Sequence, residues 1–278
     1  MFSAILASIG YAGGVVVDKL ALSVERLSTK VFIPLLFAFL AGITLLYLPF
    51  FGGMVRGLSL GAICLFVFML LVATVWNIFY YESLQKENLH EFELIMLFSP
   101  LLTVLFAEIF LPAERNLGLF FAALVASTAF VVSRIESHHI EVTRVAKKAI
   151  LAVILFSFES ILIRYLLNFF EPATLYFFRT LAVGVVFLLL YKPNFHSVSK
   201  KSLLLVFASA AFGVLQMILK FYGFRTLGVI ETTMILLLGS FMVYGFSYFY
   251  FHEKRNFKKD LACGIVVIGC IIYSTLAR

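Results

Sequence analysis

Charged side chains are scarce in this sequence, since only 13% of its 278 residues are Asp, Glu, Lys or Arg, against about 25% in soluble domains. Apolar residues make up 63% of the chain, and its mean hydropathy is +1.06. A globule of this length cannot hide so much apolar surface from water. The composition therefore excludes a soluble domain, a disordered chain and a nucleic-acid-binding module, so no nucleic acid is expected as a partner. It indicates a multi-pass membrane protein in contact with a lipid bilayer.

Catalytic and metal-binding motifs are also missing. The three cysteines show no CxxC spacing, and we interpret them as apolar packing residues. All five histidines lie in or beside predicted loops, and the chain has no P-loop, nucleophile elbow or intramembrane His/Asp cluster. We therefore expect no cofactor, no metal, no direct use of ATP and no enzyme activity. The N-terminus lacks the basic segment of a cleaved signal peptide, so its apolar stretch is expected to stay as a spanning helix.

Long continuous apolar runs fill most of the chain. A membrane-spanning helix needs about 20 mostly apolar residues, and ten such runs are present. Their continuity excludes strands, which would alternate with a period of two. The sequence thus predicts an all-α polytopic membrane protein with ten transmembrane helices and no room for a soluble domain. The predicted spans are 2–22, 31–50, 58–81, 91–111, 117–133, 148–169, 173–191, 202–222, 229–251 and 260–277.

The longest loop, near the middle of the chain, separates two halves that resemble each other. Matching residues recur in the same order at an offset of 139 to 145 positions. We predict one five-helix repeat at 1–133, a connecting loop at 134–147 and a second five-helix repeat at 148–278. Because five is odd, the second repeat must be inverted, as in alternating-access transporters whose site lies near the midplane. The matching residues are Leu6 with Leu151, Lys19 with Arg164, Pro100 with Gly239 and Glu114 with Glu253.

Short segments in both halves are typical of one family. They are Tyr81-Glu82-Ser83-Leu84, Ser99-Pro100 and Pro112-Ala113-Glu114-Arg115, then Phe224-Arg225-Thr226-Leu227-Gly228 through Leu238-Gly239-Ser240, His252-Glu253-Lys254 and Gly264. With them the chain resembles the ten-helix EamA-type members of the drug/metabolite transporter superfamily, with one EamA domain in each half. The resemblance implies alternating-access transport of small metabolites, amino acids or drugs through a central cavity, with the fifth and tenth helices as peripheral supports. Gly239-Ser240 departs from the family pattern, in which a proline often stands there.

Positive residues divide unevenly between the two sets of loops. The loops after the odd-numbered helices hold fourteen Lys and Arg residues, whereas the other loops and the termini hold four. Loops rich in Lys and Arg face the cytoplasm, so the charge count places both termini outside. The family resemblance implies the reverse, with both termini in the cytoplasm. We follow the charge count as a property of this chain, and both orientations stay open.

A few ionisable residues interrupt the apolar runs. Such a group is costly in hydrocarbon, so it must be paired, lie near a helix end or line a wet cavity. Glu159 lies near the middle of its helix, where Arg179 or Arg164 could pair with it, and either a structural ion pair or a cavity-lining carboxylate fits. Glu93 and Glu231 lie early in their helices, where the helix dipole also favours a carboxylate. Residues close enough to a helix end to reach the interface are Asp18, Lys19, Glu108 and Arg164.

Polar and aromatic residues gather at equivalent places on the predicted third and eighth helices. A spacing of four puts Trp76 over Tyr80 and Asn77 over Tyr81, although a belt at the lipid headgroups also accounts for the two tyrosines. Aromatic rings beside carboxylates favour a cationic or aromatic substrate, whereas the basic residues favour a carboxylate or phosphate, so the substrate class stays open. The predicted substrate-binding residues are Trp76, Asn77, Tyr80, Tyr81, Glu93, Glu159, Arg179, Gln216, Lys220 and Glu231.

Together these predictions favour a secondary transporter, an exporter or exchanger, of a small-molecule substrate in a bacterial or archaeal cell membrane. Proton coupling through Glu159, Glu93 or Glu231 is compatible with the sequence. An intramembrane enzyme and a non-transporting membrane partner protein are the alternatives. Nothing in the sequence specifies an oligomeric state.

Overall fold

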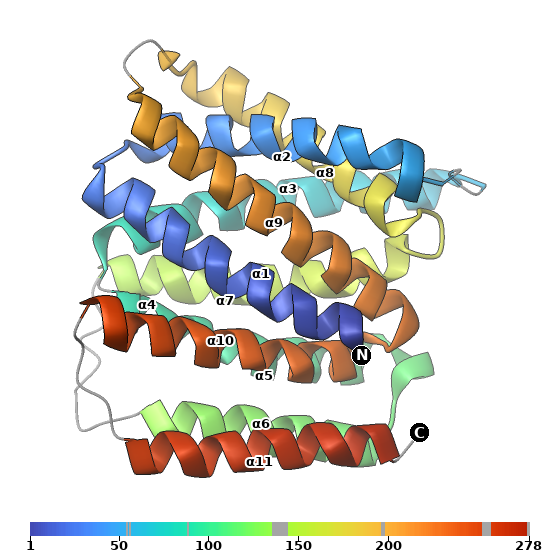
Figure 1. Cartoon of the computed structure of the whole chain (residues 1–278). Helices are drawn as coiled ribbons and strands as arrows, with labels where there is room; N and C mark the ends of the chain where they lie inside the picture. The colour runs from blue at the N-terminus through green and yellow to red at the C-terminus, as the bar shows by residue number, and fades with distance from the viewer. Residues whose placement is uncertain are drawn as a thin grey trace.

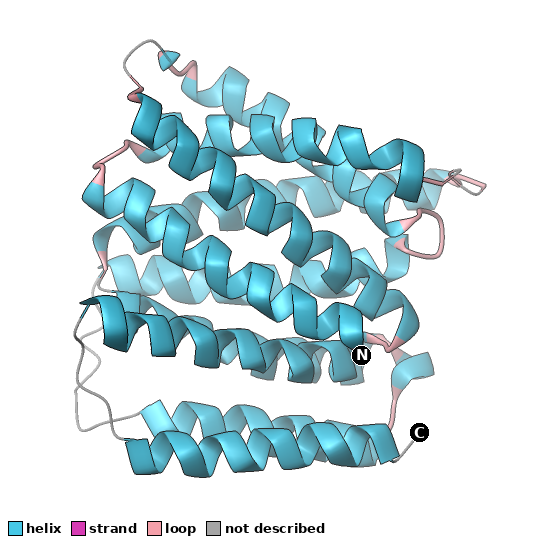
Figure 2. Cartoon of the chain, in the orientation of Figure 1, coloured by secondary structure: helices cyan, strands magenta, loops and turns pink. Residues whose placement is uncertain are grey.

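The protein is built from helices packed side by side. The computed structural model describes residues 1–53, 55, 57–87, 89–134, 144–195, 198–251 and 257–276. Within these ranges the ordered elements are helices and no strand occurs (Figure 2). Six of the described helices are long and apolar enough to cross a membrane. Four further helices contain shorter apolar stretches, at Phe98–Phe110, Leu117–Ala129, Val229–Val243 and Ala262–Tyr273. The chain is therefore an all-α polytopic membrane protein, as its composition predicts.

The helices of the first half run back and forth across the bundle. A π-helical turn, η1 (Leu20–Val24), extends the first helix, and a short 3-10 turn, η2 (Pro112–Glu114), precedes the last one. The helices are α1 (Phe2–Lys19), α2 (Thr29–Phe51), α3 (Leu60–Lys86), α4 (Leu89–Met96), α5 (Phe98–Phe110) and α6 (Leu117–Arg134).

The second half repeats this path. Its helices are α7 (Arg144–Leu166), α8 (Pro172–Tyr191), α9 (Lys200–Thr226), α10 (Val229–Phe251) and α11 (Phe257–Leu276). The N-terminus and the C-terminal end of α11 lie at the same end of the bundle (Figure 1). Among the described loops, those at this end are the turns after α2, α5, α7 and α9.

Local sequence signals explain most of the helix ends. Ser28, Ser59 and Ser199 cap α2, α3 and α9, because each side chain accepts a hydrogen bond from a backbone N–H in the first turn. Pro172 opens α8, where its missing N–H costs nothing. The backbone of Gly228 has a φ of +86°, which allows the tight turn between α9 and α10.

Three of the predicted spans differ clearly from the helices observed. The predicted span 91–111 begins at Leu89 and is interrupted by a turn at Leu97, so that it forms α4 and α5. Pro100 explains the interruption, since it has no N–H to donate to the carbonyl one turn earlier. Helices α3 and α9 run past the predicted ends at 81 and 222, because an apolar run stops at the membrane boundary and a helix need not.

Contacts between the two halves come in matched pairs. Helix α1 packs against α9 and α10, whereas α7, its counterpart in the predicted repeat, packs against α3 and α5. Helix α2 packs against its own counterpart, α8. This pattern supports the predicted repeats at 1–133 and 148–278, which stay a prediction.

Helices α6 and α11 stand apart from the rest of the bundle. They pack against each other at one side of the molecule (Figure 1) and meet the other helices through α5 and α10. Neither contributes a residue to the central cavities described below. The resemblance to EamA proteins implied this peripheral position.

Glycines bring α1 close to both of its neighbours at the middle of the bundle. A Cβ atom on Gly10 would lie 2.7 Å from the backbone N of Gln216 in α9. A Cβ atom on Gly239 in α10 would lie 2.8 Å from the carbonyl oxygen of Ser8 in α1. Small residues at such crossings let helix backbones approach closely within a membrane. These crossings fix α1 beside the candidate site.

Candidate functional site

A cavity with polar and aromatic walls lies at the centre of the bundle. It has two chambers, of about 80 Å³ and about 60 Å³, that share Tyr11, Met96, Phe156 and Gln216 as lining residues. Both chambers are far smaller than the roughly 300 Å³ of a typical ligand pocket. The helices must therefore separate before a substrate of that size can enter.

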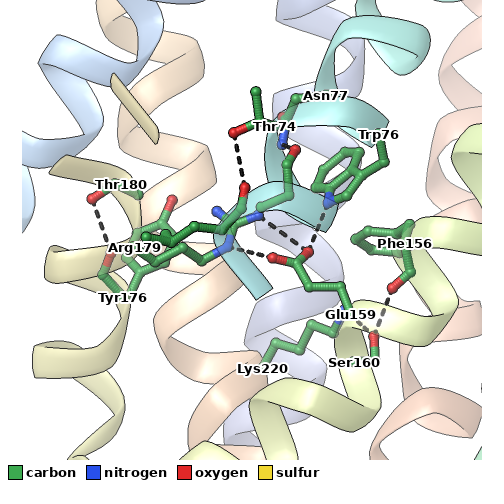
Figure 3. A network of polar contacts seen from close by, with 12 residues as sticks. Thr74, Trp76, Asn77, Phe156, Glu159, Ser160, Tyr176, Arg179, Thr180 and Lys220 are labelled. Carbon is green, nitrogen blue, oxygen red and sulfur yellow. Dashed lines mark hydrogen bonds and ion pairs between the residues drawn. The ribbon is translucent and has the colours of Figure 1, made fainter. Parts of the chain in front are cut away.

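A buried ion pair is the central feature of the site. The guanidinium of Arg179 in α8 donates to Glu159 in α7, from Nε to Oε1 at 2.6 Å and from Nη2 to Oε2 at 3.2 Å (Figure 3). The indole Nε1 of Trp76 in α3 donates to Oε2 of the same carboxylate at 2.8 Å. The two charged side chains are only 3% and 1% exposed. A two-pronged Arg–carboxylate contact fixes orientation as well as charge, so this pair holds three helices together beneath the cavity.

Lys220 of α9 reaches the same region from the other side. Its Nζ donates to Ser160 Oγ at 3.3 Å and lies 4.2 Å from the centre of the Phe156 ring (Figure 3). The ring of Phe224 lies 5.1 Å away. Contacts of a cation with ring faces stabilise the charged form of a lysine away from water. Lys220 lines the smaller chamber and Arg179 the larger one.

Aromatic rings form one wall of the larger chamber. Trp76 meets Tyr80 edge-to-face at 5.8 Å, as their spacing predicts, and meets Phe156 at 4.9 Å. Tyr80 also contacts Tyr81, with ring centres 4.9 Å apart. Rings packed in this way hold one another in place. The wall is therefore a fixed surface against which an apolar or aromatic group could lie.

Two more carboxylates lie near the cavity. Asp18, at the end of α1, lines the larger chamber and accepts a hydrogen bond from Ser209 of α9. Glu93 of α4 accepts from the hydroxyl of Tyr11 at 3.1 and 3.2 Å, so the tyrosine stands between Glu93 and the cavity. The cavity thus has a basic region around Lys220 and an acidic group at its opposite end.

Most of the predicted site residues meet at this cavity. Glu159 lies behind the cavity, bound to Arg179 and Trp76. Glu231 is buried in the first turn of α10 and lines neither chamber, and Glu93 reaches the cavity only through Tyr11. The predicted residues that line a chamber are Trp76, Asn77, Tyr80, Tyr81, Arg179, Gln216 and Lys220.

Several of the alternatives considered for single residues are wrong. Tyr80 and Tyr81 are each 8% exposed, which excludes a belt at the lipid headgroups. Arg164 is not the partner of Glu159, because it pairs with Glu114 at the end of the bundle.

The interpretation that water at a helix end solvates the charged group is also wrong for most of the residues to which it was applied. Asp18 and Lys19 are 6% and 7% exposed, so neighbouring helices rather than water surround them. Lys19 instead donates to the last carbonyls of α3, at Leu84 and Glu87. Glu93 and Glu231 are 1% and 2% exposed, so water does not solvate them, although Glu231 does lie where the helix dipole favours it.

Some cavity residues carry little or no signal in the sequence. Tyr176 lies one turn before Arg179 on α8 and lines the larger chamber, so the helical period could have suggested it. Tyr11 and Phe156 carry no such signal among 12 tyrosines and 33 phenylalanines. Ser209 is 191 residues from Asp18, and only the fold brings the two together.

Part of the chain is similar to a known protein family. Residues 144–275 match the EamA-like transporter family. The second half of the chain is therefore similar to that family. This family consists of transporters and not of enzymes, so the EamA match supports a membrane transporter in general.

The fold also has a counterpart among solved structures. One crystal structure of a protein superposes with a TM-score of 0.70, covers 98% of this chain and 98% of its own chain, and is 16% identical in sequence. At that identity the likeness shows the fold alone. No curated protein matches this chain in sequence.

Proposed function

We propose that this protein is a secondary transporter that carries a small metabolite by alternating access through the central cavity. The observation that supports this most directly is the buried Glu159–Arg179 pair, whose Arg179 lines the central cavity. Ionisable groups at that depth are costly, and in membrane proteins they mark substrate or ion pathways. A bacterial or archaeal cell membrane is the expected location.

The helix arrangement supports a mechanism in which one group of helices rocks against another. Each helix around the cavity packs mainly against helices of the other half, as α1 does with α9 and α10. In inverted-repeat transporters, a change of contacts on one side is matched by the opposite change on the other side. An exporter and an exchanger would both use this alternation between the two sides of the membrane.

Proton coupling is compatible with the buried carboxylates. Glu159 accepts three hydrogen bonds from Arg179 and Trp76, so cationic and polar donors already occupy both of its oxygens. Glu93 accepts only from the hydroxyl of Tyr11 in the described part of the chain. Glu93, which has no cation partner among the described residues, is therefore the carboxylate we propose for proton coupling. A flux that ignores both the pH gradient and the membrane potential would remove proton coupling.

Transport is tested with the purified protein in proteoliposomes. We expect saturable uptake of at least one compound from a panel of amino acids, nucleosides, amines and organic acids. Trp76→Ala should abolish that uptake, because Trp76 both lines the cavity and binds Glu159. A protein that acts only as a membrane partner would show no flux of any compound and would tolerate this substitution.

A further inference from the structure

Lys220 differs from the other buried cations of the described chain. Lys19 donates to the carbonyls of Leu84 at 2.6 Å and Glu87 at 2.5 Å, where the C-terminal end of α3 carries partial negative charge. Arg179 is held by the carboxylate of Glu159. Lys220, which is 4% exposed, forms no ion pair with any carboxylate among the described residues. Its single hydrogen bond goes to a neutral hydroxyl, that of Ser160.

The nearby charges leave an excess of one positive charge at this end of the cavity. Arg179 and Lys220 face one carboxylate, Glu159, and both carboxylate oxygens are already bound by Arg179. The indole of Trp76 takes a further place on the same carboxylate. Glu159 therefore has little capacity left to neutralise Lys220.

The other acidic groups near the cavity are too far away or are screened. Asp18 is bound to Ser209, which precedes Lys220 by eleven residues on α9. At 1.5 Å per residue, that separation is about 16 Å along the helix. The hydroxyl of Tyr11 stands between Glu93 and the cavity. A buried ammonium without an opposite charge is unfavourable, and the rings of Phe156 and Phe224 compensate only part of this cost.

We propose that Lys220 binds the anionic group, a carboxylate or a phosphate, of a small organic substrate. Phe156 and Trp76 lie beside that position, at the junction of the two chambers and in the wall of the larger one, so the apolar part of the substrate would pack against them. Gln216 lines both chambers and offers an amide to the same group. This inference rests on the proposed function, since it takes the central cavity as the substrate path.

The test is a binding titration that uses the fluorescence of Trp76. This residue is the only tryptophan of the chain and lines the cavity, so all indole emission comes from the site. Phenylacetate, phenyl phosphate, phenylacetamide and phenethylamine serve as probes, because they present a carboxylate, a phosphate, a neutral amide and an ammonium on similar rings. We expect the two anions to change the emission saturably, and the amide and amine to bind at least tenfold more weakly.

Variants of Lys220 test whether this residue binds the anionic group of the probes. Lys220→Gln should weaken binding of the anions about 10- to 100-fold, the ratio expected for loss of a charged hydrogen bond. Lys220→Arg keeps the charge and should retain most of the affinity. Lys200→Gln removes an equal charge from an exposed position at the start of α9, and should leave binding unchanged. If Lys220→Gln does not fold, the affinities of the unaltered protein for phenylacetate and phenylacetamide decide whether the site selects an anion.

Each outcome separates this inference from the proposed function. Equal binding of phenylacetate and phenylacetamide, preferential binding of the amine, or full affinity in Lys220→Gln would overturn the inference. Absence of binding by either anion up to millimolar concentration would overturn it as well. If the anions bind through Lys220 but no anion is transported into proteoliposomes, the anion site is confirmed and the proposed transport function is wrong. If cations are transported and their flux does not depend on Lys220, the transport function is confirmed and the proposed anion site is wrong.

Discussion

Removal of one partner from the Glu159–Arg179 pair should destabilise the fold severely. Glu159→Gln keeps the size of the side chain and an oxygen for Trp76, but it leaves the guanidinium of Arg179 buried without an opposite charge. The pair is 3% and 1% exposed and is joined by two hydrogen bonds of 2.6 and 3.2 Å. Breaking such a buried pair costs about 3–5 kcal/mol. We expect Arg179→Gln to cost a similar amount, because it leaves the carboxylate unpaired.

The double variant separates the pair interaction from loss of packing. With both groups changed to Gln, neither member of the pair leaves the charge of the other uncompensated, so the double variant should be less destabilised than the sum of the two single variants. The difference should reach about 2–3 kcal/mol, the upper part of the range for residues in direct contact. Unfolding by SDS in mixed micelles, followed by far-UV circular dichroism, measures each free energy.

An exposed ion pair provides the matched control. Lys148 and Glu82 lie 2.5 Å apart with side chains 43% and 29% exposed, and loss of an exposed pair costs about 1 kcal/mol or less. Lys148→Gln should therefore stay close to the unaltered protein. Additive free energies in the Glu159/Arg179 cycle, or a cost for Glu159→Gln no greater than that for Lys148→Gln, would show that the buried pair does not stabilise the bundle.

Three further predictions follow from the site and the helix crossings. Trp76→Phe removes the donor to Glu159 and should lower the free energy of unfolding by about 1.5–3 kcal/mol, the range for a hydrogen bond to a charged group; the same unfolding titration measures it, and an unchanged stability would contradict the bond. Gly10→Ala forces a Cβ to within 2.7 Å of the backbone of α9 and should cost about 1–3 kcal/mol by overpacking, whereas Gly42→Ala, with nothing within 4 Å of its Cβ, should be neutral or slightly stabilising. Reporters fused after Arg278 and before Met1 should give the same signal, because the N-terminus and the C-terminal end of α11 lie at one end of the bundle (Figure 1); opposite signals would contradict the helix count, and the sign of the common signal decides which way the protein lies in the membrane.

Helix formation was predictable because hydropathy is a local property. Each of the ten apolar runs corresponds to helical structure, and errors were confined to ends such as Lys86 and to the turn at Leu97. The partner of Glu159 was narrowed to two cations for a simple reason, since a carboxylate in the middle of a spanning helix needs a positive charge. To choose Arg179 over Arg164, one must know which face of α7 each neighbouring helix contacts. A single sequence does not contain that information.

The errors at the cavity have a common physical cause. Distance along a helix was used in place of burial by neighbouring helices. On that basis Asp18 and Lys19 were placed near the interface, and a headgroup belt was kept as the alternative for Tyr80 and Tyr81. Helices α1 and α3 continue beyond these residues, as η1 and as the turn ending at Lys86, and neighbouring helices cover them. Contacts such as Asp18 with Ser209 join residues 191 positions apart, and no local pattern encodes them.

That long separation has a consequence for how the protein is made. Ribosomes add about 5–20 residues per second, so the hydroxyl that binds Asp18 is synthesised about 10–40 s after Asp18 itself, 191 residues later. The carboxylate that binds Trp76 follows 83 residues after the indole. During that interval α1 and α3 carry buried polar groups whose partners do not yet exist. The nascent first half must therefore be sheltered by the insertion machinery until α7 and α9 arrive, and the bundle closes only when synthesis is nearly complete.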